Sequence, residues 1–346
     1  MEIYKIKTEV PEEDYYKIVD FLKSCWSDKH ALVKSKELMD FQHFNKQKRV
    51  YNFIVAENQE TGKYDALTGY IPTGHYDNKL LANGDYWGAI WKRREVIDND
   101  EGGQLGLEVW EKLFQLPNFK SLGGISLSGD AIRWYKALRW KLFYMHHYYI
   151  LNTKCKSFQI ANNVSEDKCQ DTSIEKSGEW PLRRISLNDI QEGDVVPLYK
   201  PYKSIEFLKN RYQKHPIYKY DFWGLYQNDN IYAILVSRTI TVRDSKVMRI
   251  VDALGELKGY IYPSIQRILQ EGNYEYVDFL NYGVEKHVFT EMGFQEIDFD
   301  NDQIIIPNYF EPFEQRNVKM MVMHRDKYEN YVAFKGDADQ DRPSII

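Results

Sequence analysis

The sequence contains little cysteine and no long apolar run. Its three cysteines, Cys25, Cys155 and Cys169, are odd in number and widely spaced, which excludes a disulfide framework and a paired-cysteine zinc site. No apolar stretch approaches the length that crosses a bilayer, and the first residues lack the basic-then-apolar pattern of a secretory signal. We therefore expect a cytoplasmic protein without membrane insertion, and we predict no metal site.

Excess positive charge is also absent. The chain has 46 Lys and Arg against 51 Asp and Glu, a net charge of −5 and a pI of about 6.0. Its densest basic run, Lys92-Arg93-Arg94, lies inside an expected strand. Nucleic acid is a poor candidate partner, because proteins that neutralise many phosphates usually present a strong basic face. A Ser-His-Asp order and a His-Glu-x-x-His motif are missing as well.

Apolar and aromatic residues are plentiful. The 346 residues are 43% hydrophobic and 15% aromatic, which is enough for two buried cores. Sheet positions explain most of the aromatic side chains, since these pack well on a pleated surface. Stacking on a sugar or an adenine ring is the alternative use.

One order of elements is predicted twice: a hairpin, a strand, a helix, a strand, a helix and a strand. The predicted ranges are 51–72, 86–96, 105–114, 122–127, 130–138 and 142–151 in the first half, and 222–237, 247–253, 260–269, 276–280, 284–292 and 294–299 in the second, followed by a closing strand at 318–324.

The polar residues between the two halves lack apolar periodicity. We therefore predict a domain at residues 1–163, a linker or exposed loop at 164–180 and a second domain at 181–346. Strand–helix–strand units need crossover connections, so each domain is expected to hold a mixed twisted sheet flanked by helices. The predicted fold class is α/β, or α+β by some conventions.

A glycine-containing stretch, residues 98–106, is expected to form a turn between a long strand and a helix. Glycines let backbone N–H groups converge, and a helix N-terminus adds partial positive charge, so a diphosphate could be cradled there. A simple tight turn is the alternative, and the acidic residues Asp98, Asp100 and Glu101 would repel an anion.

This order of elements resembles the GNAT acetyltransferase superfamily, in which a strand, a glycine-rich loop and a helix bind the diphosphate of acetyl-CoA. The family loop has the pattern Arg/Gln-x-x-Gly-x-Gly/Ala, where x is any residue. Here Glu101, Gln104 and Gly106 occupy the three defined positions of this pattern. Gly106 matches the last one, and Gly103 lies one position before Gln104, where the pattern has its first glycine. The resemblance implies acetyl-CoA or another acyl-CoA as co-substrate, held by Gly102, Gly103, Gln104, Leu105 and Gly106.

A second motif supports the resemblance. The family ends its next helix in a Tyr-x-x-Leu-Gly-Phe-like stretch, which corresponds to residues 135–140 here and to 289–294 in the second half. The family tyrosine often protonates the departing thiolate, so the resemblance gives Tyr135 that role; packing on the helix face is the alternative. Glu95 and Asp98 are, by position, the nearest candidates to accept the amine proton.

The C-terminal stretches 306–313 and 334–343, with 147–152 and 275–279, resemble a little-characterised group of tandem GNAT-like proteins that belongs with bacterial surface-polysaccharide synthesis. By residue chemistry alone, the aspartates after residue 336 could bind sugar hydroxyls or a cation, or form a solvated tail. His147 could be a general base or a satisfied sheet residue. The resemblance implies a shared substrate site that contains His147, Asp278, Asn308, Tyr309, Glu311, Asp337, Asp339, Asp341 and Arg342.

Three functions are compatible with these patterns. The first is an acyltransferase that N-acetylates a small amine such as an amino sugar. The second is a Fem-type aminoacyltransferase that uses aminoacyl-tRNA, although the missing basic face and coiled-coil arm argue against it. The third is a non-catalytic carbohydrate-binding or scaffold protein. Acetyl-CoA binding separates the first from the third, and affinity for bulk tRNA separates the first from the second.

Overall fold

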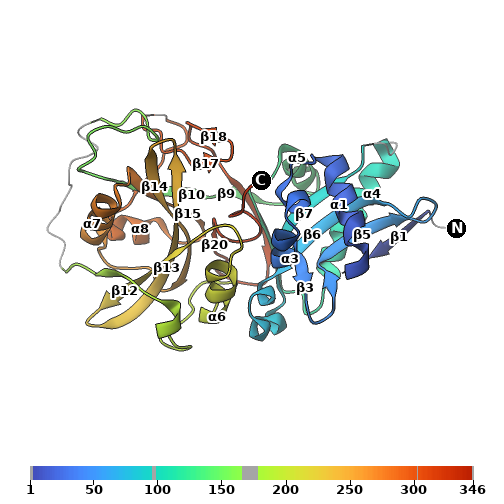
Figure 1. Cartoon of the computed structure of the whole chain (residues 1–346), viewed down its shortest axis with the longest axis horizontal. Helices are drawn as coiled ribbons and strands as arrows, with labels where there is room; N and C mark the ends of the chain where they lie inside the picture. The colour runs from blue at the N-terminus through green and yellow to red at the C-terminus, as the bar shows by residue number, and fades with distance from the viewer. Residues whose placement is uncertain (1–2, 96–98, 166–177, 302, 345–346) are drawn as a thin grey trace.

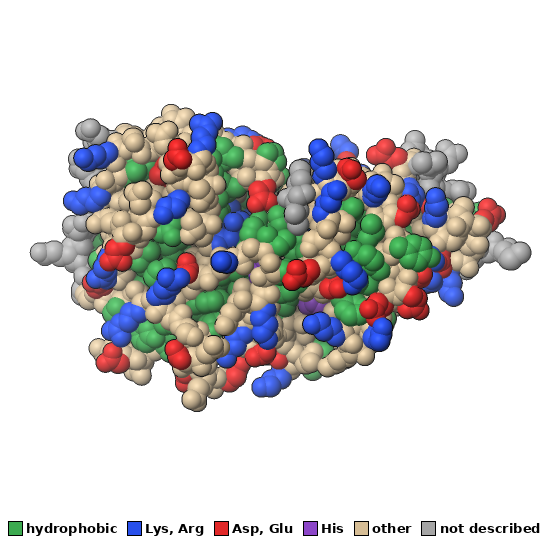
Figure 2. Space-filling model, in the orientation of Figure 1, with side chains coloured by type: hydrophobic (Ala, Val, Ile, Leu, Met, Phe, Trp, Pro, Cys, Tyr) green, Lys and Arg blue, Asp and Glu red, His purple; other side chains and the backbone are tan. Residues whose placement is uncertain are grey.

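The computed structural model describes residues 3–95, 99–165, 178–301 and 303–344, with the backbone alone at 99–103. It contains two large mixed sheets in two adjoining lobes, with helices packed on them (Figure 1). In the described parts of the chain, no helix is both long enough and apolar enough to cross a bilayer. Basic and acidic side chains are interspersed over the face in Figure 2.

The first sheet takes most of its strands from the N-terminal half. Its parallel pair, β7 with β8, lies at the centre, and the other neighbours are antiparallel. In spatial order the strands are β1 (Tyr4–Lys7), β5 (Phe53–Asn58), β6 (Tyr64–Pro72), β7 (Asp85–Arg93), β8 (Ser121–Ile125), β19 (Met321–Asp326) and β9 (Leu142–Tyr144).

The second sheet repeats this arrangement, with the parallel pair β14 and β15 in the same place. A short additional strand, β20 (Ala333–Phe334), also pairs with β15. In spatial order the strands are β11 (Leu182–Arg184), β12 (Asp221–Gln227), β13 (Asn230–Val242), β14 (Ser245–Gly255), β15 (Tyr276–Tyr282), β10 (His146–Leu151) and β16 (Gln295–Glu296).

The two halves exchange one strand each. Strand β10 precedes the predicted linker but pairs with β15 of the second sheet, whereas β19 comes from the C-terminal half and pairs with β8 of the first. The strand predicted at 142–151 is therefore split between two sheets. The strand predicted at 318–324 does not close the second sheet but lies in the first, between β8 and β9. The predicted boundaries at 163 and 181 do not coincide with the division between the sheets.

Helices cover both faces of the first sheet, as the alternation of β5 requires. Phe53 and Val55 pack under α1 (Tyr15–Cys25), α2 (Ala31–Lys34) and α3 (Lys36–His43). Ile54 and Ala56 point the other way, toward α4 (Asn99–Glu111) and α5 (Gly129–Ala137). The small sheet β2 (Val10–Pro11), β4 (Val50–Tyr51), β3 (Phe44–Asn45) lies beside the first group.

The second sheet is covered in the same way. Helices α7 (Tyr262–Gly272) and α8 (Lys286–Met292) pack on one face through residues such as Ile265 and Phe289, and α6 (Ile205–Leu208) packs on the other. A hairpin of β17 (Tyr309–Phe310) and β18 (Phe313–Glu314) adjoins this sheet.

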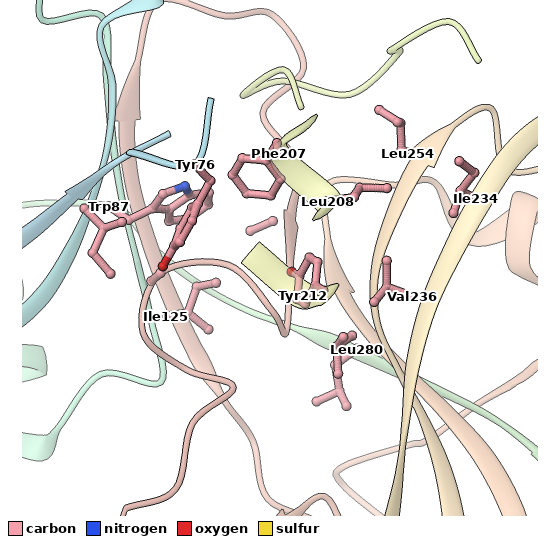
Figure 3. Close-up of a cluster of buried hydrophobic side chains, with 14 of the residues drawn as sticks. Tyr76, Trp87, Ile125, Phe207, Leu208, Tyr212, Ile234, Val236, Leu254 and Leu280 are labelled. Atoms are coloured by element: carbon pink, nitrogen blue, oxygen red, sulfur yellow. The ribbon is translucent and has the colours of Figure 1, made fainter. Parts of the chain in front are cut away.

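One apolar cluster joins the two lobes. It contains Trp87 and Ile125 of the first sheet and Phe207, Leu208 and Val236 of the second half, as Figure 3 shows. Because these side chains are nearly inaccessible to water, their burial is a substantial part of what holds the lobes in place.

Candidate active site

The central parallel strands of the first sheet diverge. The register of β7 with β8 covers only Asp85–Trp87 opposite Ser121–Gly123, and among the described strands residues 88–93 pair with β6 alone. At the paired end, the Ser121 hydroxyl donates to the Asp85 carboxylate over 2.6 Å. The pair is thus closed at one end and open at the other.

A β-bulge lies where the strands separate. Tyr70 of β6 is opposite Gly88 and Thr68 is opposite Trp91, so Ala89 and Ile90 together face the single residue between them. In a strand that is hydrogen-bonded on one side only, alternate backbone N–H and C=O groups point away from its partner. Here such groups of residues 88–92 face the space between β7 and β8.

A pocket of about 720 Å³ occupies this opening, within the size range of small-molecule sites. Both strands, two helices and the C-terminal segment contribute to it. It is lined by residues 88–93 and Glu95, by 124–128, by Gly106 and Trp110 of α4 and Leu113 just after it, by Asp130, Ala131 and 133–135 of α5, by Trp26, His30, Thr68 and Met323, and by Asp339, Gln340 and Arg342.

Tyr135 lies in an aromatic wall of this pocket. Its ring centroid is 5.5 Å from that of Trp110 and 5.7 Å from that of Trp91. The Trp110 indole N–H donates to the Tyr135 hydroxyl oxygen over 3.2 Å, and burial raises the pKa of the phenol above its usual value. Tyr135 therefore stays protonated at neutral pH and keeps its own O–H as a donor, as a general acid must.

The glycine-containing stretch differs from the prediction. Helix α4 begins at Asn99, so Gly102 to Gly106 belong to the helix rather than to a loop before it. Interior helical N–H groups bond to carbonyls four residues earlier and cannot converge on a diphosphate. Glycine weakens a helix without ending it, which is why a turn was predicted where α4 continues.

The individual residues of this stretch have different surroundings. Leu105 is buried in the core, and the Gln104 amide donates to Glu108 on the surface. Gly106 lines the pocket, and its carbonyl accepts from the Trp91 indole N–H over 2.8 Å. Glu95 is exposed at the pocket, while Asp98 lies outside the described residues.

The C-terminal segment contributes a buried carboxylate to the pocket. Asp339 is 4% exposed, and the Arg342 guanidinium donates to it over 3.1 Å. Burial acts to raise the pKa of Asp339, but the charge and hydrogen bond of Arg342, helped by His43 and Gln340, outweigh it and hold this pKa below the usual value. Asp339 is therefore ionised at neutral pH.

The neighbouring aspartates face the second sheet instead. Asp337 forms an ion pair with Lys203 over 2.8 Å. Asp341 accepts from Arg238 over 2.9 Å and from the Tyr220 hydroxyl over 2.6 Å. These contacts show an ordered, buried segment rather than a solvated acidic tail.

The structure does not bring the remaining predicted substrate residues to the pocket. His147 and Asp278 form a separate buried cluster in which Arg249 donates to both Asp278 oxygens, at 3.0 and 2.6 Å. Asn308 is buried beside them: its carbonyl accepts from Arg249, and its side chain bonds to Val318.

The buried charge of Asp278 in this cluster is paired with that of Arg249. Burial works against ionisation of Asp278, but Arg249 and His147 hold its pKa below the usual value. Burial also lowers the pKa of His147, which leaves the imidazole neutral. Tyr309 is half-buried in β17, and Glu311 accepts from the Tyr218 hydroxyl and the Ser344 N–H.

Sequence reasoning missed two members of the pocket wall. Trp110 falls in the helix predicted at 105–114 and Trp91 in the strand predicted at 86–96, and neither pattern gives them a site role. The only local signal is that both residues are tryptophans, because a tryptophan that is nearly buried usually needs a hydrogen-bond partner for its indole N–H. That these partners are Tyr135 and Gly106 depends on tertiary structure.

Comparison with known proteins supports the fold. No family model matches the sequence, and no curated protein matches it. A GCN5-related N-acetyltransferase from Anabaena variabilis has a similar structure, with a TM-score of 0.51 and 9% identity over 92% of this chain and 72% of that protein. A conserved protein of unknown function from Enterococcus faecalis, described as a probable N-acyltransferase, also scores 0.51, with 8% identity over 92% and 71% of the two chains. The chain thus has a GNAT-like α/β fold of mixed, twisted sheets flanked by helices.

Proposed function

We propose that this protein is an acyltransferase that binds acyl-CoA between β7 and β8 and transfers the acyl group to an amine. The observation that carries the proposal is the combination found in one pocket: a strand, β7, that parts from its parallel neighbour β8 after Trp87, a protonated tyrosine and an ionised carboxylate. The GNAT-like fold of the two similar structures agrees with it.

The pocket contains the groups that the reaction needs. The amine nitrogen attacks the thioester carbonyl, a C–N bond forms, and N–H groups of β7 stabilise the oxyanion. The C–S bond then breaks, and Tyr135 donates its proton to the departing thiolate. Asp339 accepts the proton that the amine loses. Asp339 is buried in the pocket, whereas Glu95 is exposed.

An amino sugar fits the mouth of the pocket as acceptor. Trp26 and Trp134 both line the pocket and are 43% and 40% exposed, unusual for side chains of this size. Such rings can stack against the apolar face of a sugar. Asp339 and Arg342 supply charged partners for an ammonium and for an anionic substituent. The part in surface-polysaccharide synthesis that we propose for this chain rests on the sequence resemblance given above.

We also infer that the two sheets are tandem copies of one GNAT-like unit. They share a strand order, a central parallel pair and a β-bulge next to that pair, between Thr68 and Tyr70 in one sheet and between Val236 and Ser237 in the other. An accidental match of all three features is improbable for unrelated sheets.

The proposal is tested by Tyr135→Phe, assayed by mass spectrometry with acetyl-CoA and glucosamine. We expect kcat to fall by about 10²-fold or more, the usual contribution of a general acid, with an unchanged Kd for acetyl-CoA. Tyr144→Phe is the matched control, because Tyr144 is exposed and lies outside the pocket lining. Failure of the wild-type protein to bind millimolar acetyl-CoA would contradict the proposal.

A further inference from the structure

The second sheet opens in the same way as the first. Strand β14 pairs with β15 only through residues 248–250 opposite 277–279, and its register with β13 shifts beside Val251. By analogy with β7 and β8, acyl-CoA would enter between β14 and β15. This reasoning rests on the function proposed above.

The chain itself fills this second opening. Strand β20 pairs with β15, with Phe334 opposite Asn281 and Ala333 opposite Tyr282. The Lys335 N–H then bonds to the Leu280 carbonyl over 3.3 Å, and the Gly336 N–H bonds to the Val251 carbonyl over 2.7 Å. In the first sheet the corresponding backbone groups face an open pocket. In the second sheet, residues 333–336 form hydrogen bonds with them.

Little space remains. Beside Phe334 the residual cavity is about 10 Å³, against about 720 Å³ in the first sheet. That is at or below the space that one water molecule needs. A Cβ at Gly336 would lie 2.3 Å from the Tyr212 hydroxyl oxygen and 2.9 Å from the Val251 carbonyl, so this part of the segment is packed as tightly as a glycine allows.

Buried ion pairs fix the segment in place. Lys203 contacts Asp252 of β14 at 2.5 Å and Asp337 of the segment at 2.8 Å. Arg238 of β13 holds Asp341, four residues later. Removing a partner from such a pair leaves a charge buried and unpaired, so displacement of the segment by a ligand is strongly opposed.

We propose that residues 333–337 are a built-in ligand of the second sheet, which takes the place of acyl-CoA there and leaves one acyl-CoA site per chain. The same segment then continues to the first pocket, where it places Asp339 and Arg342 in the wall. The last described residues before 345 lie between the two lobes, as Figure 1 shows. The second unit thereby gives up a co-substrate site and serves as a support for the acceptor side of the first.

The test is calorimetric titration of the full chain with acetyl-CoA. We expect one molecule per chain. Gly88→Leu should weaken binding at least tenfold, because Gly88 lines the first pocket and a Cβ there would already touch β8, 3.7 Å from the Gly123 carbonyl oxygen, so a leucine side chain would occupy the gap between the strands. The matched control is Leu198→Trp, which enlarges an exposed side chain at the rim of the second cavity and should leave affinity unchanged.

The outcomes separate this inference from the proposed function. Two molecules per chain would overturn the inference and leave the function standing. Binding that survives Gly88→Leu and is lost in Leu198→Trp would overturn the inference and also the placement of acyl-CoA between β7 and β8, because it would move the site to the second sheet. No binding at all would overturn the proposed function and the inference with it. The wild-type stoichiometry decides between one site and two even if a variant does not fold.

Discussion

Alternate aspartates of the C-terminal segment contact different parts of the molecule. Asp337 and Asp341 pair with cations of the second half, whereas Asp339, between them, faces the pocket of the first. The sequence showed that these residues were unusual, but not which partner each one has. Arg238 and Asp341 are 103 residues apart, and no local pattern reports a contact over that distance.

Asp339→Asn tests the role of the carboxylate in the pocket. We expect kcat/KM for the amine to fall by about 10²-fold, because the amide cannot accept the proton, while the Kd for acetyl-CoA is unchanged. Asp130→Asn is the control: Asp130 also lines the pocket but is exposed and paired with Arg133. Equal kinetic effects of the two changes would rule out a special role for Asp339.

A buried histidine makes the fold sensitive to acid. His43 is fully buried, and burial lowers its pKa to about 3, against an ordinary value of 6.5. Below pH 6.5 the unfolded chain therefore binds a proton that the folded chain does not. The contribution of His43 to stability is complete above that pH and is lost as the pH falls toward 3.

We expect that between pH 7.5 and pH 5.0 this one side chain lowers the free energy of unfolding by up to about 2 kcal/mol. His43→Phe removes the titrating group and keeps a ring against Phe53, whose centroid is 4.5 Å away. Urea denaturation at both pH values should show a smaller acid loss in the variant than in the wild type. An identical loss in both would show that His43 does not titrate between the folded and unfolded states.

At the level of elements, the sequence predicts the components of the pocket well. The strands expected at 86–96 and 122–127 are β7 and β8, and the helix expected at 130–138 is α5, each within a few residues. These elements have clear apolar periodicity. The β-bulge and the divergence of β7 from β8 were beyond prediction, because both depend on register between strands, which hydrophobic pattern alone does not encode.

Close packing beside the paired end of β8 gives a prediction at this scale. A Cβ at Gly123 would lie 2.1 Å from the Tyr331 hydroxyl oxygen and 2.4 Å from the Trp87 ring. Gly123→Ala should therefore lower the free energy of unfolding by about 1–3 kcal/mol, measured in urea. In Gly129→Ala, at the start of α5, the new Cβ meets no atom within 4 Å, so the change should stay within about 0.5 kcal/mol. Equal effects would mean that β8 can move away to accommodate the methyl group.

For the molecule as a whole, the exchange of β10 and β19 determines how the two units work together. Each sheet lacks its sixth strand unless the other half supplies it, and the segment after β19 closes one opening and forms a wall of the other. The repeated order of elements was visible in the sequence. The exchange was not, because His146 pairs with Asn281, 135 positions further along the chain, and nothing local marks β10 as foreign to its own half.

The central claim is that acyl-CoA binds where β7 and β8 diverge. A crystal structure of the chain with acetyl-CoA tests it most directly. The account predicts the pantetheine arm between the two strands, the thioester carbonyl at the bulge formed by Ala89 and Ile90, and the sulfur near the Tyr135 hydroxyl. Density for the coenzyme between β14 and β15, or an empty first pocket at saturating acetyl-CoA, would contradict it.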